Sequence, residues 1–269
     1  MLIREQMRRT AMAQSALEMN CRAEDFCADH PIVTTARTVA GARRYIRQPF
    51  FCQLASYGGN VVAAVHPDVR QAVEAYLAGG AWYACLEAPR LHLLEEALAP
   101  YGYQVCFMAE YFLPDPDRVQ EKNCVCSLRL MEKGAFDGLY LPAWENALCA
   151  ARKDADVLAL GAYDGEKLVG LAGASADCEE MWQIGIDVLP SHRRRGIAGA
   201  LTAGLTREIM RRGKVPFYCA AWSNLLSVRN ALGAGFYPAW VEVTAKPAPE
   251  VARMNGTPVR KPAAFLDKM

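Results

Sequence analysis

The sequence lacks an excess of charge of either sign, long apolar runs and an abundance of histidine. Its 30 Lys and Arg residues against 29 Asp and Glu leave a formal net charge of +1, so the whole chain exerts no pull on nucleic acid. No stretch approaches the roughly 18 apolar residues of a membrane-spanning helix. The 4 histidines are scattered without metal-site spacing. We therefore expect no nucleic-acid, membrane or metal partner, and solvated basic clusters at 43–47 and 211–214.

The 10 cysteines form no recognisable disulfide or zinc pattern, because Cys124-x-Cys126 lacks the C-x-x-C spacing. Four others fall within apolar runs predicted to be strands, where a thiol behaves as a small hydrophobe: Cys52, Cys85, Cys106 and Cys219. We expect reduced thiols in a cytoplasmic protein. Charged residues interrupt the apolar ones in Met1–Asn20, which predicts an amphipathic helix rather than a secretion signal.

The most informative segment is Val188–Ala198, which joins a predicted strand to a predicted helix that begins near Gly196. Pro190 ends the strand, and Gly196 and Gly199 keep side chains away from the first helical turn. Unpaired N–H groups at a helix N-terminus attract phosphate, and three consecutive arginines add positive charge. Neither a Walker loop nor a dinucleotide fingerprint is present. The segment predicts a pyrophosphate-binding loop, and the alternative is a basic turn before an ordinary helix.

The flanking segments predict a mixed α/β fold. Val157–Tyr163 and Lys167–Ser175 form a hairpin around Asp164-Gly165, and Met181–Val188 is the next strand. An apolar stripe follows in the helix, at Ile197, Leu201, Leu205 and Ile209. Val215–Ala221 is then a strand parallel to Met181–Val188, because a helical crossover joins the two.

Arg193-x-x-Gly196-x-Ala198 resembles the Q/R-x-x-G-x-G/A signature of the GCN5-related N-acetyltransferases (GNAT), and Asn224…Gly235-Phe236 is similar to their second signature. The resemblance covers roughly 126–246. It implies a central mixed sheet flanked by helices, with acetyl-coenzyme A as co-substrate. The pantetheine arm would lie between Met181–Val188 and Val215–Ala221, which splay apart in this fold. The implied cofactor-binding residues are Ile186, Asp187, Val188, Arg193, Arg194, Arg195, Gly196, Ile197, Ala198, Gly199 and Asn224. For Asn224, a helix N-cap and a cofactor contact are equally good interpretations.

The catalytic residues depart from the family pattern. Many members carry a Tyr where this chain has Ala231, and Tyr218 or Tyr237 is a candidate acid in its place. Buried rings with satisfied hydroxyls are the alternative for both. Glu180 shares strand parity with Trp182, at a family position for a base, and is a candidate base. A solvated turn carboxylate is the alternative for Glu180.

A chain of 269 residues is longer than one such domain. We expect an N-terminal α/β domain at 1–117, a polar linker after Pro114, and the GNAT domain at 124–269. The first half repeats the order of the second, which predicts a smaller, degenerate copy without the phosphate loop. Its expected elements are a Phe50–Ser56/Val61–Val65 hairpin, a Pro67–Leu77 helix, a Trp82–Leu86 strand, a Pro89–Ala99 helix and a Gln104–Phe112 strand. Beyond Val241–Thr244, the further strand usual in the family has only a weak candidate, Thr257–Arg260.

The expected activity is acetyl transfer to a primary amine of a small molecule or peptide, by a monomer or homodimer. Cys106–Tyr111 and Tyr45–Phe51 are expected to line the acceptor site, with Glu110 and Tyr111 as polar candidates. Ordinary packing is the alternative for both segments. Two other functions stay open: a non-catalytic sensor of acyl-coenzyme A, and an interaction module that keeps the fold as a scaffold.

Overall fold

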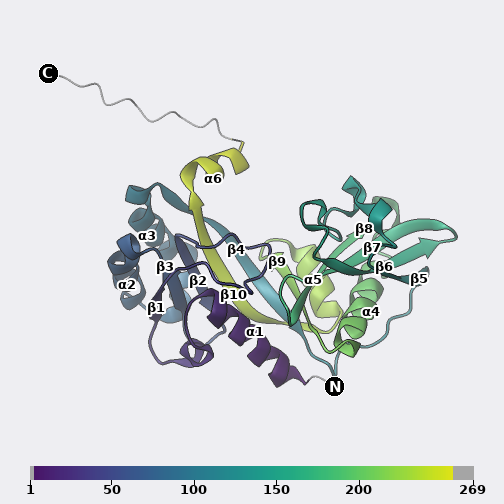
Figure 1. Cartoon of the computed structure of the whole chain (residues 1–269), viewed down its shortest axis with the longest axis horizontal. Coiled ribbons are helices and arrows are strands. Elements are labelled where there is room, and N and C mark those ends of the chain that lie inside the picture. The colour runs from purple at the N-terminus through teal and green to yellow at the C-terminus, as the bar shows by residue number, and fades with distance from the viewer. Residues whose placement is uncertain (1–2, 257–269) are drawn as a thin grey trace.

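The computed structural model describes residues 3–256, which form one ten-stranded sheet with helices on both faces (Figure 1). The helices are α1 (Arg4–Glu18), α2 (Arg70–Ala78), α3 (Ala88–Leu98), α4 (Ile197–Arg211), α5 (Leu225–Gly233) and α6 (Ala248–Met254). The strands are β1 (Ile32–Thr35), β2 (Cys52–Ser56), β3 (Val62–Val65), β4 (Tyr103–Pro114), β5 (Ser127–Glu132), β6 (Asp156–Asp164), β7 (Lys167–Ser175), β8 (Met181–Val188), β9 (Val215–Ala221) and β10 (Phe236–Pro247). Within 3–256, no helix has the length and apolarity needed to cross a membrane.

The strand order is β1-β3-β2-β10-β4-β9-β8-β7-β6-β5. The β1–β3 and β8–β9 neighbours run parallel, and the other neighbours run antiparallel. The expected mixed α/β fold is therefore confirmed. The strands predicted around the loop are confirmed within one residue at each end, because the turns at Gly165 and Gly213 adopt the positive φ that ends these elements.

A strand from the first half occupies the middle of the sheet. β4 lies between β10 and β9 and pairs antiparallel with both. The further strand expected at Thr257–Arg260 lies outside the described residues. The sheet is thus continuous across the expected linker, and the division into 1–117 and 124–269 stays a prediction.

The strand expected at Trp82–Leu86 is wrong, because these residues form a short 3-10 helix between α2 and α3. Local backbone bonds satisfy its ends, from Ala84 N to Ala81 O and from Glu87 N to Ala84 O. Cys85 is buried in the apolar cluster of α2 and α3. A short apolar run of this kind satisfies either conformation, and here no strand lies alongside to take its hydrogen bonds. The first half therefore lacks one element on which its likeness to the second half depended.

Alternating strand residues divide the core between the two faces of the sheet. Tyr218 and Phe112 point toward α4 and α5, whereas their neighbours Phe217 and Tyr111 point toward α1. The apolar stripe of α4 covers β6, β7 and β8, as its spacing predicted. Face assignments below follow this division, with an α4/α5 face and an α1 face.

A buried ion cluster joins the first half to the last strand. Arg43, 1% exposed, binds Glu18 of α1 and Glu242 of β10 through its Nη2 atom, at 2.6 Å in each case. Its Nη1 donates to the Tyr45 hydroxyl at 2.6 Å, and Trp240 Nε1 donates to Glu242 at 2.7 Å. The expectation that the basic cluster at 43–47 is solvated is wrong for Arg43, because two buried carboxylates compensate the desolvation of its guanidinium.

The loop before β6 lies flat on β7 and β8 because two opposed glycines leave room for its backbone. A Cβ atom on Gly173 or Gly185 would overlap the carbonyl oxygen of Ala147 or Asn146. The Asp187 carboxylate accepts hydrogen bonds from the backbone N–H groups of Asn146 and Ala147, both at 2.9 Å. β8 thereby fixes this loop on the α1 face.

We predict that Arg43→Met lowers the free energy of unfolding by about 3–5 kcal/mol, because Glu18 and Glu242 would remain buried without a cation. Arg44→Met is the matched control, since Arg44 pairs with Asp154 at a site where both side chains are more than half exposed. The Arg44→Met variant should lose less than about 1 kcal/mol of unfolding free energy. Urea unfolding of both variants measures the difference, and equal losses would contradict the role given to the cluster.

We predict that Gly185→Ala costs about 1–3 kcal/mol of unfolding free energy, because the new methyl group must push the Asn146 carbonyl off the sheet. Gly138→Ala, in the same loop, places its methyl group in open space and should change stability by less than about 0.5 kcal/mol. Thermal or urea unfolding compares the two. A Gly185→Ala variant as stable as the control would show that the loop does not rest on β8.

Candidate functional site

The loop between β8 and α4 has the geometry of an anion cradle. A short 3-10 turn, Pro190–His192, follows β8, and Arg193 Nε donates to the Val188 carbonyl at 3.1 Å. Gly196 then takes a left-handed conformation, φ +79°, as the N-cap of α4. A side chain is strained at such a φ, so glycine at this position permits the turn.

The first turn of α4 presents free backbone donors. Among the described residues, the N–H groups of Ile197, Ala198 and Gly199 have no hydrogen-bond acceptor, and Ala200 N is the first to bond, to Gly196 O at 3.1 Å. Arg194 and Arg195 are exposed and form no ion pair within 3–256. The stem of Lys122, which sequence reasoning missed, lies against Gly199. Free amides, a helix N-terminus and these cations suit a phosphate ester.

Beside this loop, β8 and β9 pair over three residues only and then separate. Met181, Trp182 and Gln183 pair with Val215, Pro216 and Phe217. From Ile184 onward β8 pairs with β7 alone, and from Tyr218 onward β9 pairs with β4 alone. We call the open part, Ile184–Val188 facing Tyr218–Ala221, the fork. Backbone groups that face the fork are available to an extended ligand with amide groups, such as a pantetheine arm.

The residues expected to bind the cofactor from β8 line the fork. Ile186 and Val188 pack their side chains on the α4/α5 face, and Asp187 turns its carboxylate to the loop on the opposite face. Asn224 caps α5, since its Oδ1 accepts a hydrogen bond from Ser227 N at 3.3 Å. The N-cap interpretation of Asn224 is confirmed, and a cofactor contact of Asn224 stays a prediction.

Tyr218 is the candidate acid that lies in the fork. It is 3% exposed, and its hydroxyl pairs with the Ser227 hydroxyl on α5 at 2.7 Å. Ser227 lies one helical turn before Ala231, which is itself buried. Burial raises the pKa of Tyr218, so its hydroxyl keeps its proton through neutral and mildly alkaline pH. Tyr237 lies on the α1 face, with a buried hydroxyl that has no partner among the described residues.

The two candidate carboxylates are placed very differently. Glu180 precedes the paired part of β8, at the end away from the fork, and forms an exposed ion pair with Lys214 at 3.2 Å. Glu110 lies on β4 directly opposite Ala220 of β9, half-buried and without an ion pair or hydrogen bond within the described chain. Glu110 therefore lies beside the fork and Glu180 does not.

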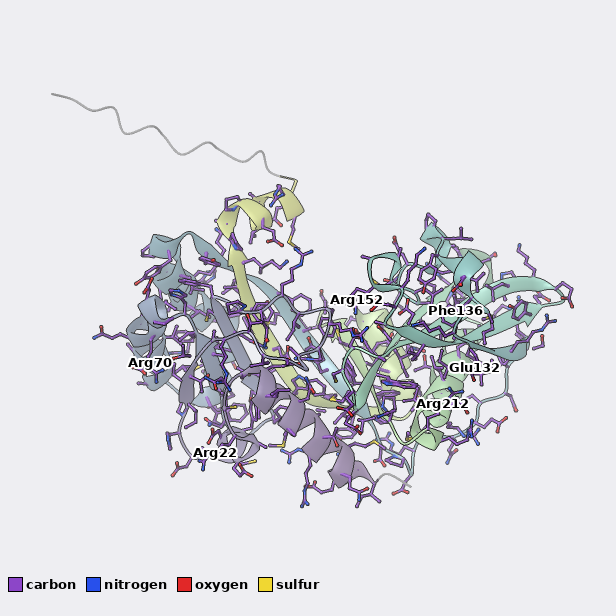
Figure 2. All side chains as sticks on the ribbon, viewed as in Figure 1. Arg22, Arg70, Glu132, Phe136, Arg152 and Arg212 are labelled. Atoms are coloured by element: carbon purple, nitrogen blue, oxygen red, sulfur yellow. The ribbon has the colours of Figure 1, made fainter. Side chains whose placement is uncertain are left out.

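The segments expected to line the acceptor site are only partly brought together. Tyr45 and Tyr111 meet on the α1 face with their hydroxyls 3.4 Å apart, and Cys219 of the fork lies opposite Tyr111. Arg152, labelled in Figure 2, approaches the Tyr45 ring and pairs with buried Asp177. Phe51 instead stacks on Tyr103 in the cluster of α2 and α3, with ring centroids 4.0 Å apart.

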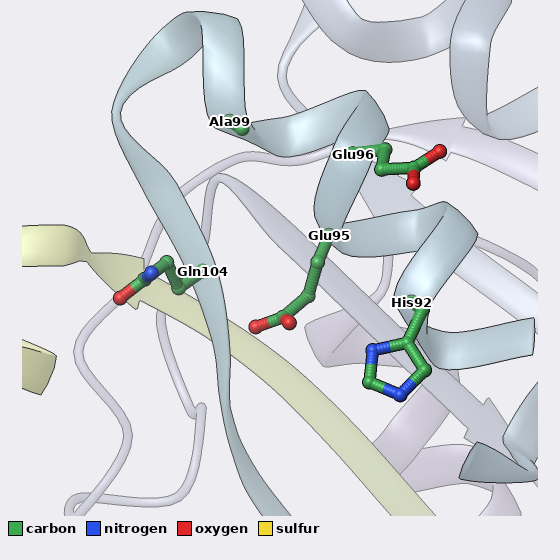
Figure 3. A pocket seen from close by; sticks show the side chains of 5 residues that line it. All are labelled: His92, Glu95, Glu96, Ala99 and Gln104. Carbon is green, nitrogen blue, oxygen red and sulfur yellow. The ribbon is translucent and has the colours of Figure 1, made fainter. Parts of the chain in front are cut away.

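Another depression lies between α3 and β4 and is lined by His92, Glu95, Glu96, Ala99 and Gln104 (Figure 3). It contains no residue of the loop or the fork. Among residues 3–256, no cluster of His, Cys, Asp and Glu fits a metal ion.

Comparisons with known proteins place the loop and the fork in one matched segment. Residues 159–233 match the family model described as FR47-like protein. No curated protein matches the chain.

Solved structures give partial likenesses. A putative GNAT acetyltransferase from Novosphingobium aromaticivorans is 16% identical over 54% of this chain and 66% of its own, with a TM-score of 0.43. A GCN5-related N-acetyltransferase from Sphaerobacter thermophilus is 18% identical over 70% and 72%, with a TM-score of 0.44. The aminoglycoside N-acetyltransferase AAC(6')-Iy, in complex with CoA, is 22% identical over 44% and 91%, with a TM-score of 0.35. The FR47-like family that residues 159–233 match is a GNAT-related family.

Proposed function

We propose that the chain is an acetyl-coenzyme A-dependent N-acetyltransferase that acts on a primary amine. The observation that carries the proposal is the adjacency of the fork to the free amides of α4. The loop donates hydrogen bonds and positive charge to the pyrophosphate, and Lys122 and Arg195 add cations beside it. The open edges of β8 and β9 receive the pantetheine arm, which places the thioester deep in the fork, near Tyr218.

In this mechanism the chain orients two reactants and moves protons. The neutral amine attacks the thioester carbonyl, a C–N bond forms, and the C–S bond breaks. Free β8 N–H groups near Val188 stabilise the negative charge on the carbonyl oxygen. Tyr218 gives its proton to the departing sulfur, and the proton lost by the new amide nitrogen restores it. The Ser227 hydroxyl, 2.7 Å away, orients the Tyr218 hydroxyl.

A second candidate function is a sensor that binds acyl-coenzyme A without turnover. Ala231 favours it, because the position where many family members carry a Tyr is a buried methyl group here. The two functions share the phosphate loop and the fork. They differ in whether bound acetyl-coenzyme A releases its thiol when an amine is present.

We predict free thiol release from acetyl-coenzyme A when the protein is supplied with polyamines, aminoglycosides, amino acids or lysine-containing peptides. The product amide is identified by mass spectrometry, and coenzyme A affinity is measured by calorimetry on the same preparation. Measurable affinity with no release across the panel would favour the sensor. An absence of affinity would leave only a scaffold role.

We predict that Tyr218→Phe lowers kcat about 100-fold, a typical contribution of a positioned acid, and leaves coenzyme A affinity unchanged. Tyr237→Phe is the matched control, because it removes a buried hydroxyl of β10 on the opposite face of the sheet. Steady-state kinetics and calorimetry on both variants give the comparison. Equal kcat values for the Tyr218→Phe variant and the unmodified enzyme would remove Tyr218 from the mechanism.

A further inference from the structure

Strand pairing places Glu110, a residue from the first half of the chain, beside the fork. β4 pairs with the open part of β9, so that Glu110 lies opposite Ala220 and Phe112 lies opposite Tyr218. Directly opposed residues of an antiparallel pair project to the same face, with Cβ atoms about 5 Å apart. Ala220 and Tyr218 both lie on the α4/α5 face. The Glu110 side chain therefore projects to the same face as the Tyr218 hydroxyl.

Ala220 places only a buried methyl group beside Glu110 on this face of the sheet. Ala220 is the β9 residue between Glu110 and the separated edge of β8. A glutamate side chain is longer than this methyl group, and the role inferred below requires the carboxylate to extend past it toward the fork. On the other side of β4, Val241 of β10 faces Glu110 and offers no charge.

Glu110 also differs from the other acidic groups near the fork in having no partner. Asp187 accepts hydrogen bonds from Asn146 and Ala147, and Asp177 pairs with Arg152. Glu110 has no cation within 4.0 Å and no hydrogen bond among the described residues, although it is half-buried. Glu110 is therefore a negative charge beside the fork that no described cation balances, and a cationic ligand would complement it.

Resting on the proposed function, we infer that Glu110 binds the acceptor as an alkylammonium ion and acts as its general base. The acceptor class is then an aliphatic primary amine that is protonated at neutral pH. The carboxylate accepts one ammonium proton and passes it to solvent, which leaves a neutral amine to attack the thioester. The second nitrogen proton is lost after the C–N bond forms, and Tyr218 supplies the proton that the sulfur receives. One proton is released to solvent for each amide formed.

The test compares Glu110→Gln with Glu180→Gln, using an aliphatic amine found to be a substrate and a thiol-release assay. Glu110→Gln should lower kcat/KM about 100-fold at pH 7. The difference in kcat/KM between this variant and the unmodified enzyme should shrink as the pH approaches the pKa of the amine, because more of the acceptor is then already neutral. Glu180→Gln makes the same chemical change at the exposed ion pair with Lys214 and should stay within about twofold of the unmodified enzyme. Glu110→Asp, which keeps the charge, should recover part of the activity.

An aromatic amine gives an independent readout, because it is already neutral at pH 7 and its turnover should depend little on Glu110. If Glu110→Gln fails to fold, Glu110→Ser provides the neutral variant. A cooperative thermal unfolding transition shows that the variant is folded. Unmodified enzyme that turns over amines, with a Glu110→Gln variant matching it in rate and pH profile, would overturn this inference alone. Failure of the unmodified enzyme to release thiol with any amine would overturn the proposed function, and the role of Glu110 with it.

Discussion

The pairing of β9 with β4 is the constraint on which the rest of the structure depends. A central strand has two edges, and β9 gives one edge to β8 over three residues and the other to β4 over the remainder of its length. Right-handed twist makes strands diverge when ladder hydrogen bonds do not hold them together. The β4 ladder fixes β9 firmly, so β9 does not follow β8 where the two part. The fork is therefore maintained by a strand from the opposite half of the chain.

The same pairing explains why the two halves behave as one sheet. β10, the last strand, lies between β2 and β4 of the first half. The buried Arg43 cluster lies over this junction and ties a loop to α1 and β10. Arg44 N donates to Asp177 O at 2.8 Å, and this hydrogen bond links the same loop to the β7–β8 turn. We propose that the expected units 1–117 and 124–269 fold together, since neither has a complete sheet without the other.

Much of the second half could be predicted from the sequence, because its signals are local. The hairpin around Gly165 and the apolar stripe of α4 depend on residues that lie close together in the sequence, so their patterns are sufficient to predict them. The prediction of a strand at Trp82–Leu86 was wrong because five apolar residues fit a strand or a buried 3-10 turn equally well. The prediction that Arg43 is solvated was wrong because its partners, Glu18 and Glu242, lie 25 and 199 residues away in the sequence. A run of basic residues carries no sign of which member will be buried.

The sequence by itself determined the conformation of the loop between β8 and α4. Pro190, Gly196 and the three arginines act through backbone conformation and charge within one turn, so their spacing is sufficient to predict it. Only the tertiary structure decided which of the two candidate carboxylates, Glu110 or Glu180, lies beside the fork. Glu180 is close to the loop in sequence, yet strand register places it beyond the paired part of β8; Glu110 is remote in sequence, yet cross-strand pairing places it opposite Ala220. The reason is physical: strand pairing is a contact between segments far apart in the chain, and the local pattern of either segment does not specify its partner.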